Sequence, residues 1–289
     1  MSRPPRWRLY LGLGRVSNLP TVWTNVVAGV TLAAVRPAAA TLVALAAACS
    51  AFYLGGMFLN DAFDRDVDAR ERPERPIPAG LLGAPEVFAV GGTLLGAGWL
   101  GVVALAGTGS RASVAAVALG AAIVLYDAWH KTNPLSPVLM GLCRVLVYVT
   151  VAYAVARQLS PAVAWGAAAL LAYLVGLTYV AKQENLAQVR NLWPLGFLAV
   201  PFAYGLPALA QGVVGVVAWL ALAAAVARAL YLLRSTAPRR IPRAVVTLIA
   251  GISLVDAVLV ARTGAPGPAV VALAAFPVTM ALQHLVSGT

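Results

Sequence analysis

The residues with chemical potential gather in one short segment, where six of the ten acidic residues lie between Asp61 and Glu74. On a continuous helix, Asp61, Asp64 and Asp68 stand at positions i, i+3 and i+7 and share one face. Carboxylates stacked in this way repel one another unless a cation lies among them. Carboxylate oxygens suit Mg²⁺ when phosphate oxygens complete its coordination shell. The spacing therefore predicts a site for Mg²⁺ and a phosphorylated substrate, with Asn60 at its edge.

The alternative interpretation of this segment is a solvated acidic loop whose carboxylates pair with its own arginines. Four arginines, Arg65, Arg70, Arg72 and Arg75, are interleaved with the acids. Exposed ion pairs of this kind are common and contribute little. The regular spacing at the end of an apolar stretch favours the metal site.

The composition predicts a membrane protein. Of the 289 residues 61% are apolar and 11% are charged, whereas soluble domains have about 45–50% apolar and about 25% charged residues. These values exclude a soluble domain, a disordered chain and a secreted disulfide scaffold. The net charge of +11 comes from basic residues scattered between apolar runs. Such a distribution fits contact with anionic lipid and not a nucleic-acid partner.

Ten apolar stretches are long enough, or nearly so, to cross a bilayer, which takes about 20 residues. They are 19–35, 39–59, 86–106, 112–129, 137–156, 161–181, 194–210, 212–233, 243–261 and 266–285. The predicted fold class is therefore all-α: a polytopic transmembrane helical bundle of nine to ten spans, formed by residues 1–289 as a single transmembrane domain.

The loops between these stretches indicate how the chain lies in the membrane. Fifteen of the 21 basic residues fall in the N-terminal arm and the even-numbered loops, against four in the odd-numbered loops. Because basic loops stay on the cytoplasmic side, we expect a multi-pass protein of the cell inner membrane with a cytoplasmic N-terminus. Residues 1–18 are expected to form an uncleaved basic arm on that face, with Trp7 and Tyr10 at the interface. Residues 60–80 face the same side.

Three segments resemble the UbiA superfamily of intramembrane prenyltransferases. The pattern Asn60-Asp61-x-x-Asp64-x-x-x-Asp68 is similar to the first aspartate-rich motif of the family, and 72–80 resembles its basic, proline-rich loop. The opening 15–20, with Asn25 further along, is similar to the family's first helix.

This resemblance implies a bundle around a central cavity that opens to lipid. Two acidic motifs at its cytoplasmic mouth would hold Mg²⁺ and a polyprenyl diphosphate, and a small-molecule acceptor would capture the allylic carbocation. Cations placed beside the departing diphosphate lower the barrier because negative charge builds up there. The resemblance assigns metal binding to Asn60, Asp61, Asp64 and Asp68, catalysis to Asp64 and Asp68, and diphosphate binding to Arg72 and Arg75.

The second acidic motif of the family departs from its pattern in this chain. At the end of the sixth stretch, Glu184 is the only acid, and its neighbours Gln183, Asn185 and Gln188 are neutral. Glu184 is expected to hold one Mg²⁺ together with substrate phosphates, and Lys182 to supply charge where the family uses a second metal. This variant resembles the UbiA-like proteins of bacterial ebo-type operons, which implies a polar acceptor.

Further residues near the predicted cytoplasmic ends are candidates for the site. Lys131 resembles a family lysine that contacts diphosphate, although simple positive-inside placement explains it equally well. Candidate substrate contacts are Asn25, Asn60, Arg72, Arg75, Tyr126, Lys131, Arg144, Tyr148, Tyr179 and Lys182, and candidate catalytic residues are Asp64, Asp68, Lys131 and Glu184. Aromatic rings close to the motifs, including Tyr53 and Tyr179, could stabilise a carbocation, although packing is the commoner role of such rings.

Intramembrane charges usually find a partner. Asp127 is expected either to act as a general base or, preferably, to pair with Arg144. Asp256 and Arg228 are expected to form a structural pair. His130 is too isolated in the sequence to indicate a metal site.

Two classes of function follow from these observations. The first is a Mg²⁺-dependent intramembrane prenyltransferase that uses a polyprenyl diphosphate, with a terpene cyclase as its variant. The second is a membrane transport or binding protein that has lost the chemistry, because charged residues inside the membrane also mark transport pathways. The oligomeric state is left open.

Overall fold

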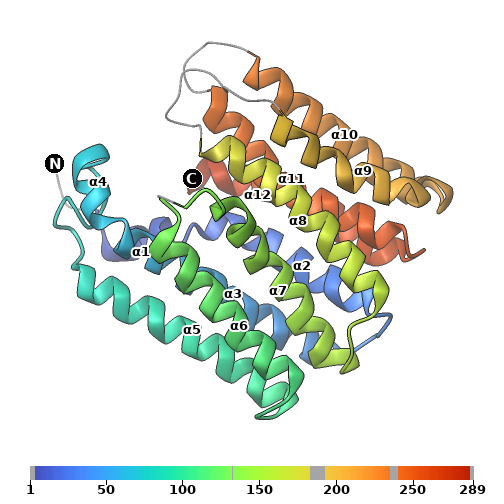
Figure 1. The fold of residues 1–289 in the computed structure, drawn as a ribbon, viewed down its shortest axis with the longest axis horizontal. Helices are drawn as coiled ribbons and strands as arrows, with labels where there is room; N and C mark the ends of the chain where they lie inside the picture. Colours follow the sequence, from blue (N-terminus) through green and yellow to red (C-terminus); the bar gives the residue numbers. More distant parts are fainter. Residues whose placement is uncertain (1–3, 132, 183–192, 235–239, 287–289) are drawn as a thin grey trace.

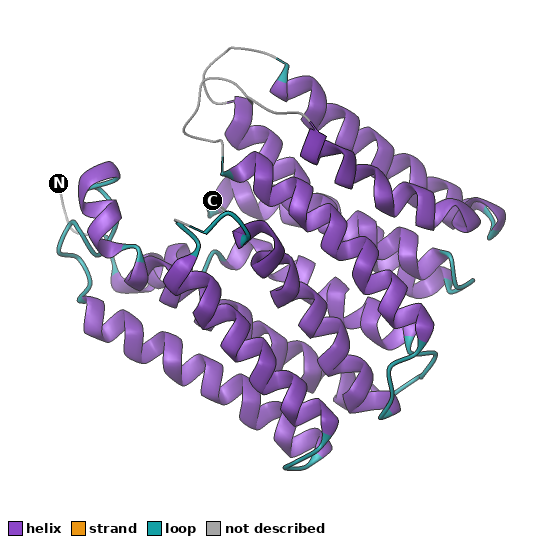
Figure 2. Cartoon of the chain, in the orientation of Figure 1, coloured by secondary structure: helices purple, strands orange, loops and turns teal. Residues whose placement is uncertain are grey.

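The computed structural model of the chain describes residues 4–131, 133–182, 193–234 and 240–286. Within these ranges the chain forms helices joined by short loops, without strands (Figures 1 and 2). In chain order they are α1 (Arg6–Leu13), a 3₁₀ turn η1 (Val16–Asn18), α2 (Leu19–Leu32), α3 (Ala39–Phe63), α4 (Arg65–Glu71), α5 (Ala84–Ala106), α6 (Arg111–Trp129), α7 (Ser136–Ala156), α8 (Pro161–Ala181), η2 (Trp193–Ala199), α9 (Val200–Gly205), η3 (Leu206–Ala210), α10 (Val213–Leu233), α11 (Arg240–Ala261) and α12 (Pro266–Leu285).

Nine candidate membrane spans occur in the described part of the chain, in agreement with the predicted all-α bundle. The sixth of them, Trp193–Ala210, is built from η2, α9 and η3 and not from one continuous helix. Pro194, Pro201 and Pro207 interrupt it, since proline lacks the N–H that a helix interior requires. The first predicted span, 19–35, is also shorter than expected, because α2 ends at Leu32 after 14 residues.

Helix α2 occupies the centre of the bundle. It contacts α3, α7, α11 and α12, and in Figure 1 it lies between the α3–α7 side and the α8–α12 side. Helix α11 is also a core helix, because 89% of its most apolar 18-residue stretch is buried, whereas α5 and α12 lie at the periphery. Peripheral side chains such as Leu100 and Val271 are more than half exposed, as expected for helices that face lipid.

Small residues bring neighbouring helices close together. A Cβ added to Gly55 of α3 would lie 2.9 Å from the carbonyl oxygen of Gly91 on α5, and one at Gly91 would lie 2.8 Å from Leu59. Such contacts between backbones are typical of helices packed within lipid. The close approach of α5 fixes α3, and α3 carries Asn60 and Asp61 at its C-terminal end.

Candidate active site

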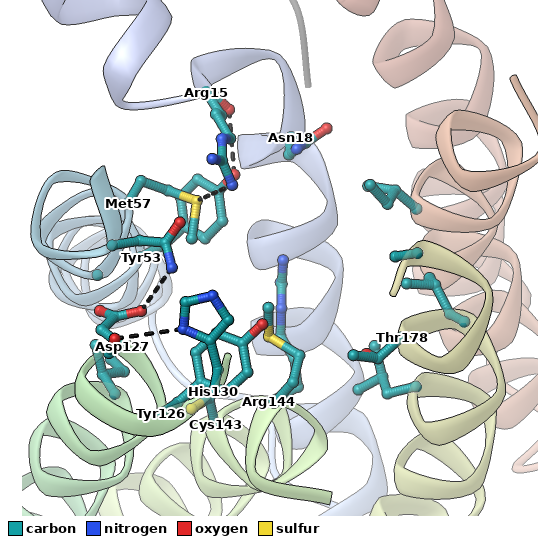
Figure 3. Close-up of a pocket in the computed structure, with 18 of the residues that line it drawn as sticks. Arg15, Asn18, Tyr53, Met57, Tyr126, Asp127, His130, Cys143, Arg144 and Thr178 are labelled. Atoms are coloured by element: carbon teal, nitrogen blue, oxygen red, sulfur yellow. Dashed lines mark hydrogen bonds between the residues drawn. The ribbon is translucent and has the colours of Figure 1, made fainter. Parts of the chain in front are cut away.

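A cavity of about 310 Å³ lies between the two sides of the bundle. Its walls come from α2, α3, α6, α7, α8 and α11, and the segment that includes α4 contributes polar groups. Figure 3 shows Thr178 of α8 facing Tyr126, His130 and Arg144 across this space. Eight of the predicted site residues line it: Asn60, Asp64, Asp68, Arg72, Arg75, Tyr126, Lys131 and Arg144. Residues far apart in the sequence therefore meet around one hollow.

Asp64 lies where α3 ends and α4 begins, and its side chain is buried against two basic groups. The Nζ atom of Lys131 is 3.1 Å from its Oδ2 atom, and Nε2 of His130 is 3.5 Å from the same oxygen. Burial by itself would raise the pKa of Asp64, but the hydrogen bonds and charges of His130 and Lys131 outweigh burial and hold this pKa below its usual range. Asp64 is thus an ionised carboxylate at neutral pH.

Arg75 neutralises the other two aspartates of the motif. Its NH1 group donates to Asp61 and to Asp68, at 3.0 Å in each case. Asp68 lines the cavity, whereas Asp61 lies behind it and also contacts Arg15 at 3.4 Å. The predicted single carboxylate face is therefore divided, because α3 stops at Phe63 and the shorter α4 starts at Arg65.

These residues carry donor atoms that match part of a magnesium site. Asn60, Asp64 and Asp68 offer the oxygen donors that Mg²⁺ prefers, and all three line the cavity. Among the described residues, however, no three acid, histidine or cysteine side chains lie close enough together to hold a metal ion by themselves. The donor set therefore fits Mg²⁺ when phosphate oxygens of a substrate complete the shell. We use "the mouth" for the side chains of Asp61, Asp64, Asp68, Arg75, His130 and Lys131.

Arg15 enters the site although the sequence marked it only within the N-terminal arm and a family-like segment. Its backbone adopts a left-handed conformation, with φ of 42°, which is unfavourable for a residue with a side chain. Tyr53 donates to its carbonyl oxygen at 3.2 Å, and the guanidinium reaches Met57 (Figure 3). The guanidinium also contacts Asp61. The arm is therefore fixed across the cavity wall. Such strained positions concentrate at functional sites.

Asp127 does not form the contact that the sequence favoured. The expected pair with Arg144 does not form, and Asn60 donates to Oδ1 of Asp127 instead, at 3.2 Å. Oδ2 is buried and has no hydrogen-bond partner in the described ranges. Next to it, His130 stacks on Tyr126 with the ring centroids 5.0 Å apart. His130 gave no signal in the sequence because its partner Asp64 is 66 residues away along the chain and approaches only in the fold.

Arg144 and Tyr148 point from α7 toward α2 and α11, where they meet Asn25 and Asp256. Arg144 donates to Oδ1 of Asn25 at 2.9 Å, and Nδ2 of Asn25 donates to Asp256 at 2.8 Å. Tyr148 donates to the other oxygen of Asp256. The expected pair of Asp256 with Arg228 is wrong, because Asp256 is fully buried while Arg228 lies on the exposed side of α10. We name Asn25, Arg144, Tyr148 and Asp256 the inner network.

Two other predicted residues lie away from the cavity, and a third is not among the described residues. Tyr179 does not line the cavity, since the face of α8 that does so carries Leu174, Leu177, Thr178 and Ala181. Lys182 donates to the carbonyl oxygens of His130 and Asn133 and to the hydroxyl of Ser136, and so holds the loop before α7. Burial lowers the pKa of Lys182. Glu184, with the rest of the second motif, lies outside the described residues.

Known proteins resemble this chain in sequence. It is 32% identical over 204 residues to digeranylgeranylglyceryl phosphate synthase of Methanopyrus kandleri, a match that covers 68% of this chain and 70% of that protein. A protein of the same name from Ignicoccus hospitalis is 40% identical over 119 residues, which cover 40% of this chain and 38% of that protein.

Solved structures share the fold. A UbiA homologue from Aeropyrum pernix superposes with a TM-score of 0.67 at 17% identity, over 84% of this chain and 96% of that one. A UbiA homologue from Archaeoglobus fulgidus bound to GPP and Mg²⁺ gives a TM-score of 0.54 at 13% identity, over 88% of this chain and 98% of that one.

The model of the UbiA prenyltransferase family matches residues 20–250, which include the aspartate motif and most of the residues that line the cavity. The chain belongs to the UbiA prenyltransferase family and is a multi-pass intramembrane prenyltransferase.

Proposed function

We propose that this prenyltransferase binds a polyprenyl diphosphate with Mg²⁺ at the mouth and transfers its prenyl group to a small polar acceptor. The observation that carries the proposal is a cavity with two chemically different ends. Asp64, Asp68 and Lys131 line one end, and apolar side chains such as Leu119, Ile123 and Ile252 line the other. A molecule with a charged head and an isoprenoid tail matches this division. The Archaeoglobus relative is described as bound to GPP and Mg²⁺.

Bond cleavage needs stabilisation of the leaving group. The allylic C–O bond breaks, and its electron pair leaves with the diphosphate. Lys131, Arg72 and Arg75 border the end of the cavity where this charge would accumulate, so they would stabilise the transition state more than the substrate. Asn60, Asp64 and Asp68 would hold Mg²⁺, and the bound ion would stabilise the departing diphosphate as a Lewis acid.

Asp127 is our candidate for the base that receives the acceptor's proton. When an acceptor oxygen bonds to the allylic carbon, its hydroxyl proton must leave. Asn60 fixes one oxygen of Asp127, while the other oxygen is buried without a partner among the described residues beside the cavity. A carboxylate oriented in this manner can take up the proton as the new C–O bond forms.

The names of the relatives suggest the first acceptor to test. Both are called digeranylgeranylglyceryl phosphate synthase, and this product carries prenyl groups on glyceryl phosphate. We therefore propose a prenylated glyceryl phosphate as a candidate acceptor, in keeping with the polar acceptor expected from the ebo-type resemblance. We also propose that the mouth faces the cytoplasm of a cell with this protein in its inner membrane, on the strength of the basic loops.

Turnover of the purified full-length protein tests the function. Protein in lipid nanodiscs receives Mg²⁺, a geranyl-to-geranylgeranyl series of diphosphates and geranylgeranylglyceryl phosphate, and pyrophosphate and product mass are measured. We expect pyrophosphate release that requires the acceptor, and a product heavier by one prenyl group. Addition of EDTA should stop it, and Glu184→Ala should reduce it sharply if Glu184 contributes to the metal site.

The same measurement separates the alternatives. A cyclase would release pyrophosphate and a hydrocarbon or terpene alcohol without any acceptor. A transport protein would move solute across liposomes without releasing pyrophosphate. The proposal fails if no diphosphate in the series is consumed while circular dichroism shows the protein to be folded.

A further inference from the structure

Arg144 lies well below the mouth. Its guanidinium is 5.4 Å from the ring centroid of Tyr53, and Tyr53 precedes Asn60 by seven residues on α3, which corresponds to about 10 Å along a helix. Arg144 is also eight residues into α7, or about 12 Å from the start of that helix. The cavity wall at this depth is mainly apolar and includes Val22, Phe52 and Val147. Arg144 is thus a cationic group in the inner, apolar part of the cavity.

The guanidinium of Arg144 is held by neutral groups. It donates to Oδ1 of Asn25 at 2.9 Å and to the hydroxyl of Thr21 at 3.1 Å. None of the ion pairs between described residues includes Arg144, whereas Arg15, Arg75 and Lys131 at the cytoplasmic end each contact an aspartate. A guanidinium offers five N–H donors, so donors of Arg144 remain for a ligand in the cavity that it lines.

Asp256 orients this cation from a distance. Its carboxylate is completely enclosed and accepts hydrogen bonds from Tyr148 and from Nδ2 of Asn25. Because Nδ2 of Asn25 is taken by the carboxylate, its Oδ1 faces Arg144. The Asn25 amide therefore links Asp256 to the guanidinium through two hydrogen bonds without a direct ion pair, and these bonds keep the planar guanidinium of Arg144 in one orientation.

We propose that Arg144 binds an anionic oxygen group, a phosphate or carboxylate, of the acceptor substrate, and that Asn25 and Asp256 are positioning residues for it. This inference rests on the proposed function and names the part of the acceptor that the chain recognises. A cation in an apolar, membrane-buried wall is costly unless it meets an anion, and the planar guanidinium matches both oxygens of such a group. The donor diphosphate belongs about 10 Å higher, beside Asp64 and Lys131.

Equilibrium binding of two matched lipids tests the subsite without any prenyl donor. Oleoyl-glycerol phosphate and uncharged oleoyl-glycerol are titrated into the purified full-length protein in detergent micelles, with calorimetry as the readout. The wild type should bind the phosphate lipid about tenfold more tightly or better, which corresponds to one hydrogen bond to a charged group. Arg144→Gln should remove this preference. Arg144→Lys should retain part of it, because lysine keeps the positive charge but lacks the planar guanidinium that can bind two oxygens at once.

Further variants define what the preference depends on. Asp256→Asn should lower it several-fold, because Asn25 is then free to rotate and Arg144 loses its orientation. Arg228→Gln on the exposed side of α10 should leave it unchanged, as a charge-matched control. In turnover assays, Arg144→Lys should raise KM for the acceptor and leave KM for the donor unchanged.

The result separates this proposal from the proposed function. Equal binding of the two lipids by the wild type overturns the subsite, even if prenyl transfer occurs. An undiminished preference in folded Arg144→Gln or Arg144→Lys also overturns it. A preference that depends on Arg144 in a protein without prenyl transfer supports the subsite and contradicts the proposed function. An oleate arm distinguishes a carboxylate from a phosphate as the favoured anion.

Discussion

The mouth and the inner network both place acids beside cations, but they do so in different ways. At the mouth, Asp64 contacts Lys131 directly, and Arg75 bridges Asp61 and Asp68. In the inner network, Asp256 is fully buried and reaches Arg144 only through the amide of Asn25. Lys131 is 45% exposed, whereas Asp256 has no exposed surface.

This difference indicates two physical roles. Lys131 is partly exposed, so its direct pair with Asp64 contributes little stability and can exchange partners, and Lys131 can shift from the carboxylate to an incoming diphosphate. A saturated buried carboxylate is costly to disturb, so Asp256 fixes three helices and keeps Arg144 in place. Variants at the mouth should therefore change activity with little change in stability, and variants of the inner network should affect both.

The largest expected effect is on activity at the mouth. Asp64→Ala should abolish pyrophosphate release, a loss of at least about a hundredfold, because removal of one electrostatic catalytic group typically costs that much. Its thermal unfolding in detergent should stay close to wild type. Asp66→Ala is the matched control, since Asp66 lies two residues away with a side chain that is 79% exposed. Wild-type activity in Asp64→Ala would remove the mouth from the reaction.

The next effect is on stability in the inner network. Asp256→Ala should lower the free energy of unfolding by about 3–5 kcal/mol, because it leaves Tyr148 and Asn25 without their buried partner. Denaturation by SDS, followed by circular dichroism, measures this loss. Asp61→Ala at the mouth should lower the free energy of unfolding much less. If the two variants are equally stable, the proposed division between an adaptable mouth and a rigid inner network is wrong.

Two buried tyrosines sharpen the same comparison. Tyr148 donates to the Asp256 carboxylate, whereas Tyr173 donates to the backbone carbonyl of Leu248 at 2.9 Å. Hydrogen bonds to charged groups contribute more than neutral ones, about 1.5–3 against about 1 kcal/mol. Tyr148→Phe should therefore destabilise the protein more than Tyr173→Phe in the same SDS titration. The reverse order would indicate that Asp256 is uncharged in the fold.

Much of the fold could be predicted from apolar runs, because a membrane span must be continuous in hydrophobicity. The same runs could not show where a helix stops. The first predicted span continued to residue 35, but α2 ends at Leu32, and Ala34 takes a positive φ of 55°. Alanine and valine are equally apolar in a helix and in the turn that follows it. Hydropathy likewise could not show that residues 193–210 form η2, α9 and η3 and not one continuous helix.

The site was predictable where one short stretch of sequence carried the signal and not where distant helices met. Asn60, Asp64 and Asp68 could be identified by their spacing near the end of α3. The partner of Arg144 could not, since Asp127 and Asn25 were both at plausible depths. Only packing of α2 between α7 and α11 selects Asn25. For the same reason His130 was passed over, although it contacts Asp64.

The smallest expected effect is a pH shift at the mouth. His130 and Lys131 lower the pKa of Asp64 against the effect of burial, so His130→Gln should raise this pKa. Ionised Asp64 is needed in the proposed reaction, and activity falls as pH drops through its pKa. The acidic limb of pyrophosphate release, normalised to its maximum, should therefore move to higher pH in His130→Gln and stay in place in His284→Gln, whose ring is exposed.

The same variant should unfold more readily in acid. A carboxyl group whose pKa is lowered in the fold stabilises the protein above the ordinary carboxyl range, and this stabilisation is lost as pH falls through the folded pKa. His130→Gln reduces the lowering, so its resistance to acid unfolding should decrease. Tyr148→Phe should leave the limb where it is, since the inner network does not touch Asp64. An unchanged limb in His130→Gln would mean that Lys131 alone sets the charge of the Asp64 carboxylate.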